Sequence, residues 1–400
     1  MATTSTIRCP SAAARASVPP VSRASSSGCA WKDTSVNDTV AVLQPPVLET
    51  PLAAQRRPGR HAVRAVGAVA LAGVLLGYVF PRVVGSTVTD VRAAFGAVSS
   101  REAAVLVLLW AAGLLTHSFV LTGALPGLTR RRALTLNLTG SAVANTMPFG
   151  GAAGMSLNYL MIRTWGVESS GFAAFTLVTN VWVVLLKLAM PVLALAALWS
   201  TGGPVSAATR WTAVASMGAL LVVLVLLAVG LASRRAAERA AHVVAPVVVG
   251  IGRVVRRHPD PARVSASILD CRDLVADVLK RRWGQMSLGM LGYGLLQAVL
   301  LWACLHAVGA DLAPAAVLAG FAVDRVMTLV VITPGAVGFA EAGTAAALIA
   351  LGGSPAAVAA GVLLYRGFTF ALEIPVGGTW LAGWLFWRRR ATRAASGTAA

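Results

Sequence analysis

The chain has few charged residues: Asp, Glu, Lys and Arg make up 12% of its 400 residues, whereas 57% are hydrophobic. Soluble domains carry roughly 25% charged and about 45–50% apolar residues, so this composition excludes an ordinary soluble domain. Acidic residues are especially scarce, with 15 Asp and Glu against 34 Lys and Arg. The net charge of +19 does not predict nucleic-acid binding, because the arginines cluster beside hydrophobic segments, at 56–60, 130–132 and 388–390. That pattern is typical of contact with anionic lipid headgroups at the cytoplasmic face of a membrane.

Several common chemical motifs are also missing. The sequence has no GxxxxGK[ST] loop for nucleotide phosphates, so a nucleotide-driven pump is not expected. The cysteines form no CxxC pair and have no histidine at a ligand spacing, which argues against a metal site or a disulfide framework. They are Cys9, Cys29, Cys271 and Cys304. We therefore predict no metal, no cofactor and no catalytic residues, and the sequence leaves the oligomeric state open.

Long apolar runs fill most of the sequence. A helix that crosses a bilayer core of about 30 Å needs about 20 apolar residues. Six runs are predicted as full spans: 62–80, 103–125, 171–199, 210–232, 286–309 and 356–387. With the segments between them they form a predicted transmembrane domain at 61–390, followed by a short tail at 391–400. Residues 1–60, rich in Ala, Ser, Pro and Thr, read as a disordered cytoplasmic tail; a transit peptide or a start codon assigned too early is the alternative.

Two further apolar segments, 133–162 and 314–352, contain helix breakers near their centres. The breakers are Pro148, Gly150 and Gly151 in the first segment, and Pro334, Gly335 and Gly338 in the second. Irregular backbone at membrane depth is tolerated only where it is buried in protein or lines a wet cavity. The breakers therefore mark the tips of two re-entrant helical hairpins, with a pair of kinked, tightly packed helices as the alternative.

The distribution of arginines favours the hairpins. A polar insertion at 233–285 carries eleven Lys and Arg against five Asp and Glu, and the positive-inside rule places it in the cytoplasm. A single crossing by segment 133–162 would put that insertion outside, whereas two hairpins entering from opposite faces put every arginine cluster inside. We predict an all-α polytopic integral membrane protein with six full spans and two oppositely oriented re-entrant helical hairpins, about eight membrane segments. Both termini are expected in the cytoplasm, and the membrane is expected to be the plasma membrane.

The insertion also has a helical pattern of its own. Apolar residues recur at three- and four-residue steps, at Val264, Ile268, Cys271, Val275 and Leu279. This periodicity predicts an amphipathic helix lying along the cytoplasmic membrane surface.

Ionisable residues inside the apolar segments are the main functional candidates, because a charge at membrane depth is costly and usually faces a cavity or another charge. Glu341 follows the second tip and Arg366 lies about 14 Å into the last span at 1.5 Å per residue, so the two are predicted to meet near the midplane. A purely structural ion pair is the alternative. The other candidates are Asp324, Arg325, Glu373 and Lys187, with Glu373 two turns beyond Arg366 on nearly the same face.

Short motifs around these residues resemble a known family. Residues 333–342, "TPGAVGFAEA", resemble the P-G-G-L-G-x-x-E-A signature of the lysylphosphatidylglycerol synthase transmembrane, or flippase-like, family, with Ala336 and Val337 replacing Gly and Leu. The segment "LLYRGFTFALEIPVGG" resembles that family's final helix, and "NTMPFGG" at 145–151 fits in position, which adds Asn145 to the candidates. The resemblance covers about residues 62–390. The soluble aminoacyl-transferase domain of the family's fused members is not expected here.

The resemblance implies a flippase or transporter that moves a phospholipid or another lipid-linked amphiphile between leaflets, with membrane lipids as its partners. A membrane-embedded transferase that uses a lipid-linked donor is a second hypothesis. It would need acids in a sizeable outer loop, and the loop at 81–102 offers only Asp90 and Glu102. A non-transporting membrane scaffold is a third, and it would leave the buried charges unexplained. An enzyme is not expected.

Overall fold

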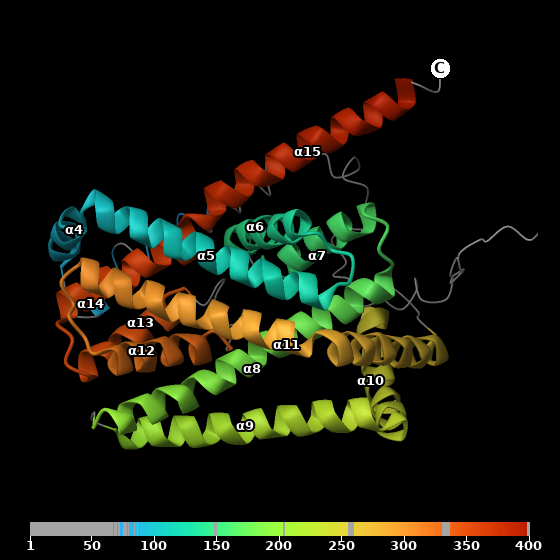
Figure 1. The fold of residues 1–400 in the computed structure, drawn as a ribbon, viewed down its shortest axis with the longest axis horizontal. Helices are drawn as coiled ribbons and strands as arrows, with labels where there is room; N and C mark the ends of the chain where they lie inside the picture. The colour runs from blue at the N-terminus through green and yellow to red at the C-terminus, as the bar shows by residue number, and fades with distance from the viewer. Residues whose placement is uncertain are drawn as a thin grey trace, which may run out of the picture. The chain divides into compact units, whose positions relative to one another are not determined.

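The computed structural model describes residues 87–147, 150–202, 205–254, 260–329 and 337–397, with isolated positions between 67 and 85. All regular structure in those ranges is helical (Figure 1). Several predictions fall on other residues: the tail at 1–60, most of the span at 62–80, and the three tip residues Pro148, Pro334 and Gly335 lie outside the described part of the chain.

Five helical stretches in the described ranges are long and apolar enough to cross a membrane. They correspond to five of the six predicted full spans, so the expectation of an all-helical, multi-pass membrane protein is confirmed. The first four are α5 (Ser100–Ala124), α8 (Ser169–Ser200), α9 (Ala207–Ala232) and α11 (Pro261–Ala307). The fifth stretch consists of α14 (Pro355–Arg366), the π-helix η3 (Gly367–Ala371) and α15 (Glu373–Gly397).

The exposed surface of helix α9 is typical of a helix surrounded by lipid hydrocarbon. Only Ala213 and Ser216 are buried among its 26 residues, and large apolar side chains such as Leu221, Val225 and Leu226 are more than half exposed. A helix that is hydrophobic all round and yet exposed is stable only in lipid.

The two acids of the loop at 81–102 are used as helix caps. Asp90 lies in the short helix α4 (Val88–Gly96), where its carboxylate accepts a hydrogen bond from the backbone N–H of Thr87 at 3.1 Å. Glu102 accepts one from the backbone N–H of Ser99 at 2.8 Å and so begins α5. Both carboxylates thus satisfy N–H groups that a helix start leaves unpaired.

The insertion at 233–285 differs from its prediction. It contains α10 (Arg234–Val254) and the first part of α11, which continues without a break into the span predicted at 286–309. The predicted amphipathic face is therefore the start of a 47-residue helix and no separate surface helix. Gly284 is the breaker next to the expected boundary, and its cost of about 1 kcal/mol is too small to end a well-packed helix.

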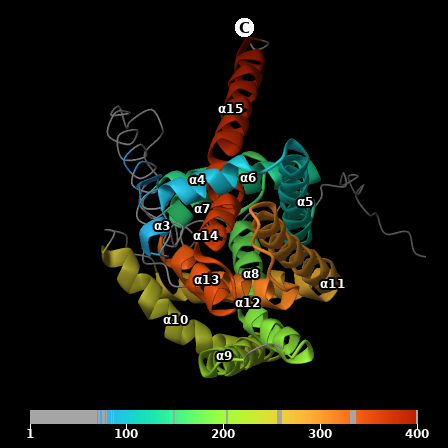
Figure 2. The ribbon, with the colours of Figure 1, turned by 90° about the vertical axis from the view of Figure 1, so that its left-hand side faces the viewer.

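That amphipathic face is used for packing between helices. Val264 and Ile268 of α11 contact Ala245 and Val249 of α10, and Val275 joins the main core. In Figure 2, α10 is seen along much of its length whereas α9 is foreshortened, so α10 crosses the direction of the spanning helices.

Both segments with breakers fold as two short helices packed side by side. The first segment forms α6 (Arg130–Thr146) and α7 (Gly150–Thr164), and the second forms α12 (Pro314–Met327) and α13 (Phe339–Ala350). With 12 to 17 residues each, the arms are about 18–26 Å long at 1.5 Å per residue, short of a bilayer core of about 30 Å. Figure 1 shows the α6–α7 pair toward the end of the bundle that carries α10, and the α12–α13 pair toward the end where α8 turns into α9.

Glycine allows the two arms of the first pair to approach closely. A Cβ at Gly150 would lie 1.7 Å from the backbone oxygen of Ala144, and one at Gly154 would lie 2.6 Å from that of Gly140. No side chain fits at either distance, so Gly150, a predicted site residue, is explained by backbone contact near the tip.

Candidate functional site

Buried charges gather where the second pair of short helices meets the last span. Asp324 and Arg325 lie in the last turn of α12, Glu341 in the first turn of α13, and Arg366 at the end of α14. Glu341 is 0%, Asp324 3% and Arg366 7% exposed. Together with Lys187 of α8 these four residues form what we call the ionic network.

The carboxylate of Glu341 makes two separate polar contacts. Its Oε1 lies 2.7 Å from Nε of Arg366, so the predicted contact between these two residues is present. Its Oε2 accepts a hydrogen bond from the backbone N–H of Gly338 at 2.7 Å. Gly338 has a φ of +89°, a conformation that favours glycine. One carboxylate therefore caps α13 just after its tip and also neutralises an arginine of α14.

Asp324 connects two arginines. It pairs with its neighbour Arg325, and its Oδ1 lies 3.9 Å from Nη2 of Arg366. Arg325 in turn donates to the hydroxyl of Tyr365 at 3.3 Å and lies over the ring of Phe321. Nη2 of Arg366 is buried and makes no hydrogen bond within the described residues. The 3.9 Å contact with Asp324 is too long for a hydrogen bond, so the network retains a guanidinium donor without a hydrogen-bonded acceptor among the described residues.

Lys187 adds a third cation. Its ammonium group donates to the backbone oxygen of Thr328 at 3.2 Å, at the C-terminal end of α12, where a positive charge complements the helix dipole. By formal charge, the network holds three cations against two anions. This excess is suited to an anionic group such as a lipid phosphate.

Glu373 was predicted to lie on nearly the same face as Arg366, but its side chain does not join the ionic network. Its side chain instead lies 3.4 Å from Nδ2 of Asn145, on α6. The reason is the π-helix that follows Arg366, in which Leu372 donates to Gly367 over five residues and so rotates the later residues around the helix axis. Pro375 accounts for this irregularity, because it has no N–H to continue an α-helical ladder. Asn145 and Glu373 thereby connect the first pair of short helices to the last span.

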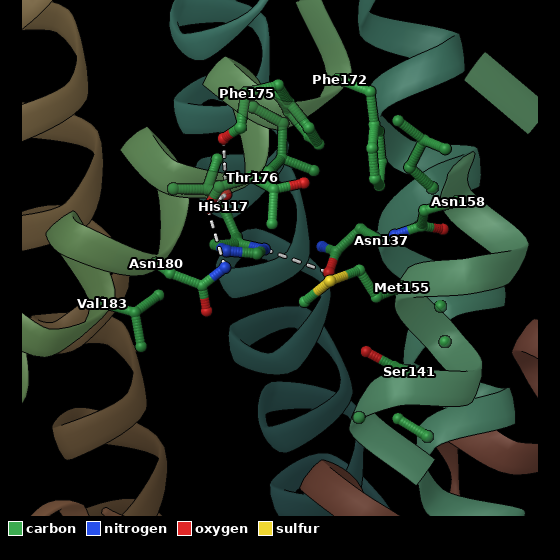
Figure 3. Close-up of a pocket in the computed structure, with 17 residues that line it drawn as sticks. His117, Asn137, Ser141, Met155, Asn158, Phe172, Phe175, Thr176, Asn180 and Val183 are labelled. Atoms are coloured by element: carbon green, nitrogen blue, oxygen red, sulfur yellow. Dashed lines mark hydrogen bonds between the residues drawn. The ribbon is translucent and has the colours of Figure 1, made fainter. Parts of the chain in front are cut away.

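A second polar feature was not predicted from the sequence. A cavity of about 280 Å³, the amide pocket, lies between α5, α6, α7 and α8. Its walls carry three asparagines, one histidine and two phenylalanines: Asn137, Asn158, Asn180, His117, Phe172 and Phe175 (Figure 3). Nδ1 of His117 lies 3.0 Å from Oδ1 of Asn137. Polar residues in otherwise apolar helices were the available signal, but the sequence does not reveal that they share one cavity.

The predicted glycine Gly151 belongs to this pocket rather than to the ionic network. A Cβ at Gly151 would meet no atom within 4 Å. The structure thus separates the described candidates. The ionic network and Gly338 lie at the second pair of short helices, Asn145 and Glu373 connect the first pair to the last span, and Gly150 and Gly151 lie at the start of α7, with Gly151 in the wall of the amide pocket.

Comparison with known proteins places the whole arrangement in one family. Residues 65–377 match the family described as Lysylphosphatidylglycerol synthase TM region, which includes both helix pairs, the ionic network and the amide pocket. No curated protein matches the chain. The match confirms the resemblance first seen in three short motifs. The chain belongs to the lysylphosphatidylglycerol synthase TM region family and is a multi-pass membrane protein.

Proposed function

We propose that this protein is a lipid flippase or transporter, and not an enzyme, which moves a phospholipid or another lipid-linked amphiphile between leaflets. The observation that carries the proposal is the ionic network, with three formal cations and two formal anions inside an apolar bundle. Asp324, Glu341 and Arg366 are buried there, and Arg325 and Lys187 are half-buried. Such charges are costly in hydrocarbon and typically mark a substrate pathway. A passing lipid phosphate would interact with the cationic excess and with Nη2 of Arg366, which has no hydrogen-bond partner among the described residues.

We further propose that the two pairs of short helices are re-entrant hairpins entering from opposite faces. In transporters, broken helices of this kind direct their ends at the substrate near the midplane. The length of the four arms supports this reading, since each is shorter than a bilayer core. The position of Glu341 beside the second break supports it too.

The same proposal fixes an orientation in the plasma membrane, with both termini and α10 in the cytoplasm. Helix α10 exposes Val243, Val244 and Val247, at 72%, 45% and 59%, and also carries Arg234, Arg235 and Arg239. A helix with an exposed apolar strip and several arginines is typical of the interface with anionic lipids.

An apolar cavity supports a substrate with acyl chains. It measures about 480 Å³ and is lined mainly by alanine and other small residues of α8, α9, α12 and α13. Ala319, Ala322 and Val323 of α12 belong to its wall and precede Asp324 directly. A lipid chain in this cavity would thus lie on the helix that carries part of the ionic network.

The test is reconstitution of the purified chain into liposomes that contain a fluorescent phospholipid in both leaflets. Dithionite added outside bleaches only the outer leaflet, so a lipid mover should lower the protected fluorescence well below one half. The matched control is Gly218→Leu, a change at an exposed position of α9 with open space around it. Liposomes with the wild-type chain that keep half of the fluorescence for every phospholipid and glycolipid tried would refute the proposal.

A further inference from the structure

We propose that the amide pocket binds one uncharged, hydroxyl-rich ring, and that this ring is the sugar head group of a neutral glycolipid. The pocket shares no residue with the ionic network. The inference rests on the proposed function only in taking the ligand to be a membrane lipid. The recognition of the ring itself follows from the pocket walls.

The first argument is charge. None of the described lining residues is Asp, Glu, Lys or Arg. A phosphate or an ammonium group in this pocket would leave water without an ionic partner, which costs several kcal/mol at membrane depth. The pocket therefore selects against the charged head groups that would suit the ionic network.

The second argument is the hydrogen-bonding capacity of the walls. Amide and hydroxyl side chains come from three helices, with Asn137 and Ser141 on α6, Asn158 on α7, and Asn180 on α8. Figure 3 shows them around one space. Amides offer both donors and acceptors, which is what a ring with several hydroxyl groups requires, because each hydroxyl also donates and accepts.

Asn158 points most directly to a ligand. Its Oδ1 is buried and has no hydrogen-bond partner among the described residues, and its amide lies against Gly140, where a Cβ would come within 2.9 Å of Nδ2. Glycine at position 140 is thus required to seat this amide. A buried oxygen without a partner costs about 1–3 kcal/mol, which a ligand hydroxyl would offset.

The third argument is shape. The rings of Phe172 and Phe175, 6.2 Å apart between centroids, form one wall, and a flat aromatic surface suits the C–H face of a sugar. The pocket volume of about 280 Å³ lies near the lower end of the roughly 300–1,000 Å³ that is typical of small-molecule sites. A space of this size is suited to a compact head group such as one sugar ring.

The experiment measures binding to the full chain by native mass spectrometry from detergent micelles. The probes are monoglucosyl diacylglycerol, diacylglycerol without the sugar, phosphatidylglycerol and free methyl glucoside. We expect the glucosyl lipid to bind at least tenfold more tightly than diacylglycerol, and phosphatidylglycerol, which the ionic network would take, to leave the bound glucosyl lipid in place. This comparison uses the wild-type chain alone, and equal affinity for diacylglycerol or displacement of the glucosyl lipid by phosphatidylglycerol would overturn the proposal.

A pair of matched variants locates the site. Gly151→Leu fills the pocket and Gly218→Leu adds the same side chain on α9, and a Cβ at either glycine meets open space. We expect Gly151→Leu to weaken glucosyl-lipid binding at least tenfold and Gly218→Leu to leave it unchanged, with Asn158→Leu as a second variant that removes the amide. Wild-type binding in a folded Gly151→Leu chain would overturn the assignment to this pocket.

Two further outcomes separate the parts of the argument. If methyl glucoside binds as tightly as the glucosyl lipid, a soluble sugar is the ligand and the assignment to a lipid is wrong. If the glucosyl lipid binds selectively while the liposome assay shows no lipid movement, the proposed transport fails and the recognition of the ring stands.

Discussion

Replacing Glu341 and Arg366 with glutamine, singly and together, tests whether the two form a coupled pair. Oε1 and Nε are 2.7 Å apart, so the Coulomb attraction is about 6 kcal/mol at an effective dielectric constant of about 20. Desolvation of both ions offsets much of this attraction, and breaking one such buried pair typically costs about 3–5 kcal/mol. We expect each single variant to lose free energy of unfolding in that range.

The surrounding charges predict which single variant is worse. Glu341→Gln leaves three formal cations facing one anion, whereas Arg366→Gln leaves two of each, so Glu341→Gln should be the more destabilising. Glutamine at position 341 still accepts the hydrogen bond from Gly338, so this substitution removes the charge without removing the cap. The double variant restores the wild-type excess of one cation and should lose about 2–3 kcal/mol less than the sum of the single losses.

The assay is unfolding in mixed micelles titrated with a denaturing detergent, followed by circular dichroism for all four chains. Gly218→Leu again serves as the control for an unrelated change in the bundle. Losses that add within about 0.5 kcal/mol would refute the coupling. Single losses below about 1 kcal/mol would show that the two charges are effectively solvated.

Three other predictions concern the backbone, the link between the helix pairs, and orientation. Gly338→Ala should lower the free energy of unfolding by about 1–3 kcal/mol because residue 338 has a positive φ. Gly284→Ala in α11 should instead raise it by up to about 1 kcal/mol. Equal effects of the two variants in detergent unfolding would contradict this prediction. Asn145→Leu should cost about 1–3 kcal/mol by leaving the half-buried Glu373 without its amide, and an unchanged melting temperature would argue that the link is unimportant. In a chain with its own cysteines replaced, cysteine at position 238 should react with an impermeant maleimide only from the cytoplasm and cysteine at 311 only from outside; labelling of both from one side would contradict the orientation.

The positions of the spans could be predicted because hydrocarbon selects strongly on local composition. A run of about 20 apolar residues with few charges has no other stable placement, and five such runs match helices in the structure within a few residues, apart from the joined start of α11. The meeting of Glu341 and Arg366 followed from the same physics, since two opposite charges at one depth lower their cost by pairing.

Features that depend on packing could not be predicted in this way. The continuity of α11 through Gly284 goes with packing on α5, where Gln285, next to this glycine, donates to the backbone oxygen of Phe119. The π-helix that carries Glu373 away from Arg366 is a short irregularity that changes the direction of the side chains after it. The amide pocket could not be predicted because its asparagines come together only when four helices pack against one another. His117 and Asn137, for example, lie 20 residues apart on different helices and meet only in the folded chain.

The central claim is that the ionic network serves lipid movement in addition to stabilising the fold. The direct measurement is the liposome assay with the double variant Glu341→Gln/Arg366→Gln, because neutral amides at both positions remove the pair while leaving no unpaired charge behind. The account predicts that the folded double variant, reconstituted at the same protein-to-lipid ratio as the wild type, moves phospholipid at least tenfold more slowly. A folded double variant that moves phospholipid at the wild-type rate would contradict it.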